Sequence, residues 1–285
     1  MNTLYDRSLG TLFFCGSVLA ALLSPGANAA ILASYTDFTS ACGTTLTCVG
    51  STTSATPILR LTPAAGSQSG AAYSTTAVTL GGGGIFSTQF QFQFTNAGGI
   101  APADGITFVL AANPTGLGVG GGGLGYLGVP NSVAIEFDTF DNGGGVGDNG
   151  DNHVAVDTGG VLNGTGVSPY GITSCGFNTT TGCMSNGHIW TADIAYDGTN
   201  LTASLQDGAN AVQNLINTAI NIPTLLGTNN VFVGFTAGTG AGFENQDILN
   251  WQFANTASIN NNVPEPASLL LVGLGLAGLG LRRRK

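Results

Sequence analysis

The sequence predicts an all-β sandwich or barrel, because short alternating runs dominate it and no helical period is sustained. The clearest run, "FSTQFQFQF" at 86–94, places phenylalanine and threonine on one face and serine and glutamine on the other. Since side chains alternate along a strand, this run is a strand with one buried face. Gly, Asn, Asp and Thr interrupt the runs, as turn residues do in sandwiches.

Further runs of this kind are predicted as strands, and they cover 104–112, 132–140, 152–157, 188–198, 201–206 and 229–237. Asp197 and Gly198 between two of them are a hairpin signal. Residues 210–226 have room for one short helical turn. The segment 159–187 is rich in Gly, Thr and Ser and is predicted to be a long surface loop.

The N-terminal segment 1–29 is predicted to be a secretion signal peptide. Arg7 precedes an apolar run at 9–23, and the small residues "ANA" at 27–29 form a cleavage site. We expect cleavage near Ala29, which leaves 30–258 as one large exported domain.

The C-terminal segment 259–285 carries Pro264, Glu265 and Pro266, then fifteen uncharged residues, then four basic residues at 282–285. It resembles the PEP-CTERM sorting tag of Gram-negative bacteria. The resemblance implies a transient transmembrane helix in the inner membrane and a sorting protease that cuts at the Pro-Glu-Pro. The destination would be the cell surface, outer membrane or extracellular matrix. A plain C-terminal anchor is the alternative.

The expected domain is strongly acidic. Of six basic residues in the chain, five lie in the two terminal segments and Arg60 remains; of fifteen acidic residues, thirteen remain, so the net charge is near −12. With one basic residue the domain cannot neutralise a phosphate backbone, which excludes nucleic acid as a partner. Bound divalent cations would offset part of the charge.

The domain's cysteines form two close pairs in an exported chain. We predict the disulfides Cys42–Cys48 and Cys175–Cys183, one of three possible connectivities. A zinc site is the alternative, but neither pair has the C-x2-C spacing.

One glycine-rich loop concentrates the carboxylates: Glu136, Asp138, Asp141, Asp148 and Asp151 fall within sixteen positions, followed by His153. Hard oxygen ligands suit calcium, and a mixed oxygen and imidazole set suits manganese or a similar ion. Two adjacent cations would explain why so many carboxylates tolerate one another. A solvated acidic turn is the alternative; the EF-hand pattern does not fit.

"VAIEFDTFDN…D…NHVAVD" resembles the metal loop of the legume-type (L-type) lectins, and five other blocks match in order: 59–74, 103–114, 120–128, 191–205 and 231–253. The resemblance spans about residues 31 to 254. It implies an antiparallel jelly-roll β-sandwich of the concanavalin-like type.

The resemblance also implies two sets of metal ligands. Those of the transition metal, expected to be Mn2+, are Glu136, Asp138, Asp148 and His153; those of Ca2+ are Asp138, the Phe140 carbonyl, Asn142 and Asp148. The spacing after Asn142 departs from the family, and Asn149 replaces the usual proline, so Asp151 could take the place of Asp148.

A sugar site follows from the same resemblance. Asp104, joined to Ala103 by a cis peptide, would accept bonds from sugar hydroxyls, while Asn142 and the backbone N–H of Gly122 (or Gly123) would donate. The Phe140 ring would stack on the sugar. In the loop 238–245, the amides of Ala241 and Gly242 would close the pocket.

We therefore expect an exported, metal-dependent carbohydrate-binding protein without catalytic activity. Its partners would be a glycan or exopolysaccharide and the sorting protease, with a homodimer as a further expectation. A glycoside hydrolase is one alternative, but Phe140 stands where the second glutamate of the E-x-D-x-E pattern should be. A structural or adhesive matrix protein is the other.

Overall fold

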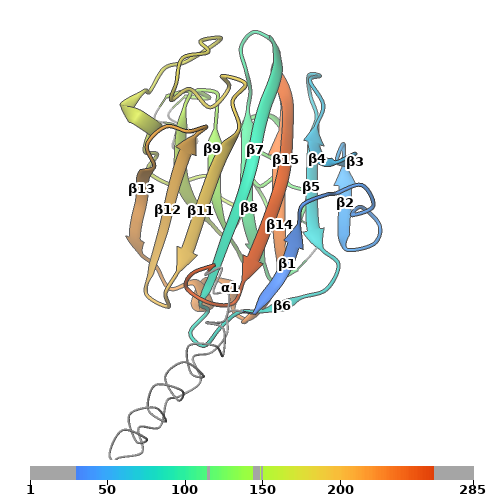
Figure 1. Cartoon of the computed structure of the whole chain (residues 1–285), viewed down its shortest axis with the longest axis vertical. Coiled ribbons are helices and arrows are strands. Elements are labelled where there is room, and N and C mark those ends of the chain that lie inside the picture. The colour runs from blue at the N-terminus through green and yellow to red at the C-terminus, as the bar shows by residue number, and fades with distance from the viewer. Residues whose placement is uncertain (1–29, 114–115, 144–147, 149, 260–285) are drawn as a thin grey trace, which may run out of the picture.

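The fold is a sandwich of two antiparallel sheets (Figure 1), and the computed structural model describes residues 30–113, 116–143, 148 and 150–259. One sheet contains β1 (Ile31–Tyr35), β3 (Thr53–Ala55), β4 (Ile58–Thr62), β7 (Phe86–Gly99), β11 (Trp190–Tyr196), β12 (Asn200–Asp207), β13 (Gln213–Ala219) and β15 (Gly242–Ala254). The other contains β2 (Leu46–Gly50), β5 (Ser69–Ser74), β6 (Val78–Thr79), β8 (Gly105–Ala111), β9 (Ser132–Asp138), β10 (His153–Thr158) and β14 (Asn230–Gly238).

The strand order in the eight-stranded sheet is β13-β12-β11-β7-β15-β4-β3, with β1 also pairing with β15. The seven-stranded sheet has the order β10-β9-β8-β14-β5-β2, with β6 also pairing with β14. Both orders mix strands distant in sequence, as jelly-roll connections require, and the prediction of an all-β sandwich is confirmed.

The core between the sheets is largely aromatic. The alternation predicted at 86–94 is confirmed, because Phe86, Phe90, Phe92 and Phe94 are fully buried while Gln89 is exposed. The Phe90 ring packs edge-on against Phe235 of the facing sheet, with 4.9 Å between ring centroids. This packing fixes β7 opposite β8, β9 and β14.

A second apolar layer covers the outer face of the seven-stranded sheet. Ala134 of β9 and Val109 of β8 pack there against Leu124, Tyr126 and residues near them in the loop before β9. The even-numbered side chains of β9 are therefore buried although they point away from the core between the sheets. Glu136 and Asp138 share that face with Ala134.

Eight strands were not predicted from the sequence: β1 to β6, β13 and β15. Residues 210–226 form β13 as well as the expected helical turn, which is α1 (Ile222–Leu226). β15 was not predicted as a strand because Glu244, Asn245, Gln246 and Asp247 interrupt its apolar pattern. All four are buried, so polarity here does not mark a solvent-exposed face.

Both predicted disulfides are confirmed: Cys42–Cys48 and Cys175–Cys183, with Cα–Cα distances of 5.4 and 5.7 Å. The second closes a short ring within the predicted surface loop 159–187. In that loop the described backbone has one 3-10 turn, η2 (Pro169–Gly171), and no strand of its own.

The expectation of a transmembrane helix requires correction. Across the described ranges, no helix is long and apolar enough to cross a membrane. The α-helix α1 has five residues, and a membrane span needs about 20. The segment 1–29, predicted as a signal peptide, and residues 260–285 of the predicted sorting tag lie outside the described residues.

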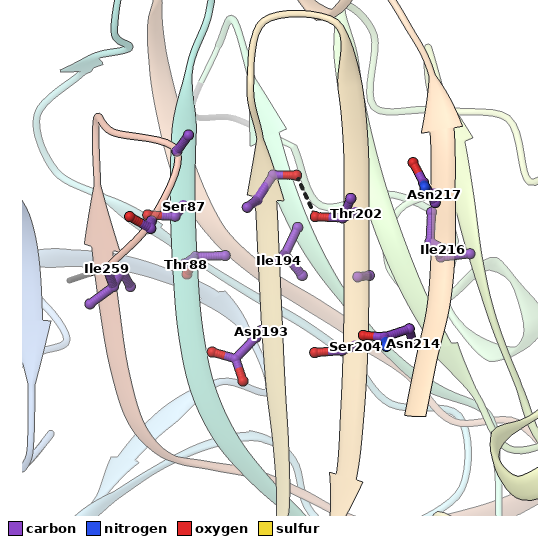
Figure 2. A pocket seen from close by; sticks show the side chains of 14 residues that line it. Ser87, Thr88, Asp193, Ile194, Thr202, Ser204, Asn214, Ile216, Asn217 and Ile259 are labelled. Carbon is purple, nitrogen blue, oxygen red and sulfur yellow. Dashed lines mark hydrogen bonds between the residues drawn. The ribbon is translucent and has the colours of Figure 1, made fainter. Parts of the chain in front are cut away.

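The outer face of the eight-stranded sheet carries a shallow pocket of about 530 Å³ (Figure 2). Its floor consists of small and polar side chains such as Asp193, Thr202 and Ser204, and Ile259 stands at one side. Because no aromatic ring lines it and the acidic loop belongs to the other sheet, it is not the site that the sequence predicts.

The aromatic core gives a stability prediction. Phe90→Ala leaves a cavity among four other phenylalanine rings and should lower the free energy of unfolding by about 3–5 kcal/mol. Gln89→Ala, on the exposed face of the same strand, should change it by no more than about 0.5 kcal/mol. Equal losses in urea unfolding would contradict this assignment of faces.

Candidate functional site

The register of β9 and β10 brings three ionisable side chains together. His153 lies opposite Asp138, and Ala155 lies opposite Glu136, so Glu136, Asp138 and His153 project from one face of adjoining strands. One ligand atom from each residue lies within 4.8 Å of the others. All three are at least 97% buried, and together they could hold a metal ion.

The tautomer of His153 suits a metal ligand. Its Nδ1 lies 3.0 Å from the Gly150 carbonyl oxygen, and because a carbonyl only accepts, Nδ1 carries the proton. Nε2 then faces Glu136 Oε1 at 3.1 Å. Burial lowers the pKa of His153, but the hydrogen bond to Glu136 and its charge, together with the Gly150 carbonyl and Asp148, more than offset this, so the pKa is raised. An imidazole oriented by a backbone carbonyl is the usual arrangement of a metal-binding histidine.

The carboxylates around His153 repel one another. Burial and the neighbouring charge of Glu136 raise the pKa of Asp138 well above its usual range. On the same face of β10, burial and Glu136 raise the pKa of Asp157 to about 8. Buried acids without an opposite charge are unfavourable, and a bound cation would reverse that penalty. The donor set of two carboxylates and one imidazole therefore fits a divalent ion.

The loop after β9 continues this acidic face. Phe140 donates its backbone N–H to Asp138 Oδ1 at 2.7 Å, and Asn142 donates its own to Asp148 Oδ2. Burial raises the pKa of Asp148 to about 6. Asp148 is brought near the three buried ligands without being one of the group. Residues 144–147 and 149 lie outside the described residues.

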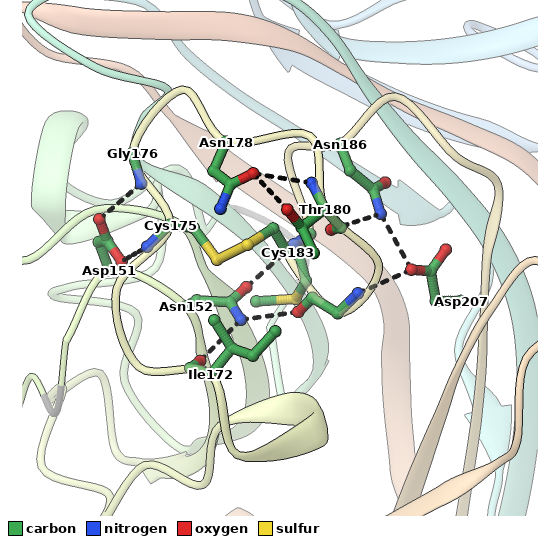
Figure 3. Close-up of a disulfide and its surroundings, with 12 residues drawn as sticks. Asp151, Asn152, Ile172, Cys175, Gly176, Asn178, Thr180, Cys183, Asn186 and Asp207 are labelled. Atoms are coloured by element: carbon green, nitrogen blue, oxygen red, sulfur yellow. Dashed lines mark hydrogen bonds between the residues drawn. A yellow bond between two sulfur atoms is a disulfide. The ribbon is translucent and has the colours of Figure 1, made fainter.

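Asp151, the alternative to Asp148, has a different role. Its Oδ1 accepts from the Cys175 N–H at 2.6 Å and its Oδ2 from the Gly176 N–H at 2.8 Å (Figure 3). Both carboxylate oxygens thus bind the disulfide loop, defined as residues 175–183. The geometry favours Asp148 as the residue available to an ion.

The acidic loop contacts the predicted sugar-binding aspartate. The peptide between Ala103 and Asp104 is cis, as expected, and Asn142 Nδ2 lies 3.4 Å from Asp104 Oδ1. A Cβ added to Gly122 would lie 2.4 Å from Asn142 Cγ, so glycine is needed there for the amide to approach. Burial raises the pKa of Asp104 to about 6, and its Oδ2 makes no hydrogen bond of normal geometry.

Two glycine-containing loops meet beside Asp104. Asp104 Oδ2 lies within 4.0 Å of the positions of a Cβ on Gly121 and on Gly240. A cavity of about 330 Å³ opens between these loops, lined by Ser67, Gln68, Ser69, Gly120, Gly121, Thr239 and Gly240. No sequence pattern marks Ser67, Gln68 or Ser69 as site residues, because hydroxyl and amide side chains in a turn carry no distinctive signal.

The remaining predicted sugar contacts differ in exposure. Phe140 is half-buried and Ala241 is exposed, whereas Gly242 is buried, and a Cβ there would lie 2.4 Å from the Ala101 carbonyl oxygen. Between the two glycine candidates, Gly123 donates its N–H to Gly120. Gly122 remains the donor candidate, and it lies against the Asn142 side chain, whose Nδ2 is 3.4 Å from Asp104 Oδ1.

Glu244 is a further acid near the site that the sequence analysis missed. It is fully buried, and its Oε1 accepts from Thr139 Oγ1 at 2.9 Å, one residue beyond Asp138. Burial raises the pKa of Glu244 to about 8, although the Ser185 and Thr139 hydroxyls partly offset the shift. The one sequence signal for Glu244 was its position as an acid within an otherwise strand-like segment.

Profiles of two known families match the chain. That of the legume lectin domain covers residues 33–268, and that of the PEP-CTERM protein-sorting motif covers residues 262–285. The lectin alpha chain of Lablab purpureus is 30% identical over 223 residues, which are 73% of this chain and 74% of that protein. The lectin of Pisum sativum is 28% identical over 188 residues, 61% and 62% of the two chains.

Solved structures share the fold. The lectin from Bauhinia forficata, in complex with GalNAc, has a TM-score of 0.64 at 22% identity and covers 78% of this chain and 96% of its own. Lectin I from Ulex europaeus, in complex with the methyl glycoside of α-L-fucose, has a TM-score of 0.62 at 23% identity with the same coverage.

The raised pKa of Glu244 predicts a pH dependence of stability. Folded Glu244 keeps its proton up to about pH 8, while the unfolded chain loses it above about pH 4.5. The unfolded state therefore binds fewer protons in this window, and stability falls as pH rises. Glu244→Gln should remove this loss, which amounts to at most about 4 kcal/mol at pH 8. A difference in Tm that stays constant from pH 5 to pH 8 would contradict this.

Proposed function

The chain belongs to the legume lectin family, and from this premise we propose that it is an exported, metal-dependent protein that binds carbohydrate. One observation carries the proposal. Glu136, Asp138 and His153 form a buried group that could hold a metal ion, and the loop after Asp138 brings Asn142 Nδ2 within 3.4 Å of Asp104 Oδ1. The residues proposed to bind cations and those proposed to bind sugar are thus connected by the loop that follows β9. The targets we propose are cell-surface or exopolysaccharide glycans.

The metal ligands we propose are those of the sequence analysis. Glu136, Asp138, Asp148 and His153 would hold a transition ion such as Mn2+. Asp138, the Phe140 carbonyl, Asn142 and Asp148 would hold Ca2+. When bound, the ions supply positive charge that relieves the repulsion among buried carboxylates and orders the loop.

The sugar would bind by directed hydrogen bonds and stacking. Asp104 accepts from sugar hydroxyls, and its buried Oδ2 makes no hydrogen bond of normal geometry among the described residues. The Asn142 amide and the Gly122 N–H donate, and the half-buried Phe140 ring supplies an apolar floor. The amides of Ala241 and Gly242 stand at the opposing loop. An ionised acceptor makes such bonds stronger than neutral ones.

We propose no catalytic role for the acidic strand. A glycosidase needs two carboxyl groups that flank a bound glycosidic bond. Glu136 and Asp138 form one group with His153 that could hold a metal ion, and Phe140 stands where the second glutamate of a glycosidase pattern should be.

Export is supported by the PEP-CTERM protein-sorting motif at 262–285. We infer that a sorting protease recognises this motif and that the mature domain acts at the cell surface, outer membrane or extracellular matrix.

The metal assignment predicts the effect of one substitution. Asp138→Ala should abolish binding of both Ca2+ and Mn2+, because this carboxylate belongs to both proposed ligand sets. Isothermal titration of chelator-treated protein with each metal measures the affinity for that ion. Asp193→Ala, at an exposed carboxylate of the other sheet, is the control and should bind both ions normally. Unchanged ion binding by Asp138→Ala would contradict the ligand set.

The sugar assignment is tested on an array of mono-, di- and trisaccharides of galactose, N-acetylgalactosamine, fucose, glucose and mannose. Binding should require Ca2+ and Mn2+ and disappear with chelator. Asp104→Asn should weaken the strongest interaction at least about tenfold, because a charged acceptor is lost, while both metals still bind. Sugar binding by the variant at wild-type strength would refute the role of Asp104.

A further inference from the structure

A second pocket lies between the end of β7 and the disulfide loop. Its volume is about 250 Å³, slightly below the roughly 300–1,000 Å³ of ordinary ligand pockets, so it fits a small group such as one sugar ring. The residues that line it include Thr95, Asn96, Pro102, Phe177, Thr179 and Ser185.

The chemistry of this pocket suits an uncharged hydroxylated ring. Phe177 is 57% exposed, which is unusual for a phenylalanine at the edge of a cavity. The Asn96 and Thr179 side chains make no hydrogen bond within the described part of the chain. No charged side chain lines the pocket. An aromatic face beside an open amide and an open hydroxyl offers stacking and directed hydrogen bonds together.

The disulfide loop holds Phe177 in a defined position. The Cys175–Cys183 bond closes the loop, Asn178 Oδ1 accepts from the Thr180 N–H at 3.0 Å, and Cys183 donates to the Thr180 carbonyl at 3.1 Å. Figure 3 shows these contacts within one small ring of chain. A preorganised loop loses little conformational entropy when a ligand binds to it.

The same loop is fastened to the proposed metal loop. Asp151 accepts from Cys175 and Gly176, the two residues before Phe177. Asn152 Nδ2 donates to the carbonyls of Ile172 and Gly182 at 2.9 and 2.8 Å (Figure 3). Both residues lie between Asp148 and His153, so the chain that would enclose the ions also positions the disulfide loop.

The pocket adjoins the primary site. Pro102, in its wall, is two residues before Asp104. Ser185, on the other side, lies close enough to Glu244 to lower its pKa, and Glu244 accepts from Thr139, the neighbour of Phe140. Fully buried Glu244 thus has neighbours next to both sites, and its Oε2 makes no hydrogen bond of normal geometry.

We propose that this pocket is a second sugar subsite, in which Phe177 stacks on a residue of an oligosaccharide whose terminal sugar occupies the Asp104 site. The inference rests on the proposed function and deepens it. It makes the preferred target an oligosaccharide rather than a single sugar, because two adjoining subsites bind a linked ligand better than either alone.

The experiment compares affinities for free saccharides of the same panel by isothermal titration. Wild-type protein should bind a di- or trisaccharide more tightly than its terminal monosaccharide. Phe177→Ala should lower the oligosaccharide affinity about tenfold and leave the monosaccharide affinity within about twofold. Thr179→Ala should shift the same pair of affinities in the same direction. Val212→Ala removes an equally exposed apolar side chain far from this pocket's lining and should alter neither affinity.

The outcomes separate the two proposals. Oligosaccharide affinity within about twofold of wild type in Phe177→Ala, with monosaccharide binding intact and dependent on Asp104, overturns the second subsite and leaves the proposed function standing. Loss of monosaccharide binding in a folded Phe177→Ala protein, judged by Tm, also overturns it, because the subsites would not be separate. Wild-type protein that binds no saccharide of the panel overturns both.

Discussion

The pairing of His153 with Asp138 across β9 and β10 is the interaction on which the rest of the site depends. This register places Glu136 and Asp138 beside an imidazole whose Nδ1 is held by the Gly150 carbonyl. A shift of one residue would turn both carboxylates into the phenylalanine core, where no group could compensate them. The apolar layer over the outer face of the sheet removes water from these groups, so a cation becomes the natural counter-charge.

Around this pair the chain uses small residues to bring polar groups close. Gly122 has no side chain, so the Asn142 amide can pass it and approach Asp104. Glycines 121 and 240 approach the same carboxylate from two other loops. Several loops distant in sequence thus meet at one end of the sandwich, and each contributes one or two groups. Such convergence is how a rigid sheet scaffold presents a binding site.

The disulfide loop extends this arrangement to the other sheet. Asp151 and Asn152 join it to the acidic loop, while Asp207 of β12 accepts from the Gly182 N–H and from Asn186. One covalent bond and several buried hydrogen bonds therefore fix a segment that has no strand of its own. Asp151 and Asn152 thus connect the end of the acidic loop to the disulfide loop.

The sequence by itself predicted an all-β sandwich or barrel, favoured the observed pairing of the cysteines and located the acidic loop. These depend on local alternation, on short Cys spacing and on a dense cluster of carboxylates, all of which are visible in one dimension. Tertiary structure decided the contacts of Asp151 and Glu244, the exposure of Phe177 and the strand β15. Asp151 looked like a ligand in sequence, yet its partners are 24 and 25 residues away. Burial of a polar strand and the convergence of loops depend on contacts between distant segments, which no local pattern encodes.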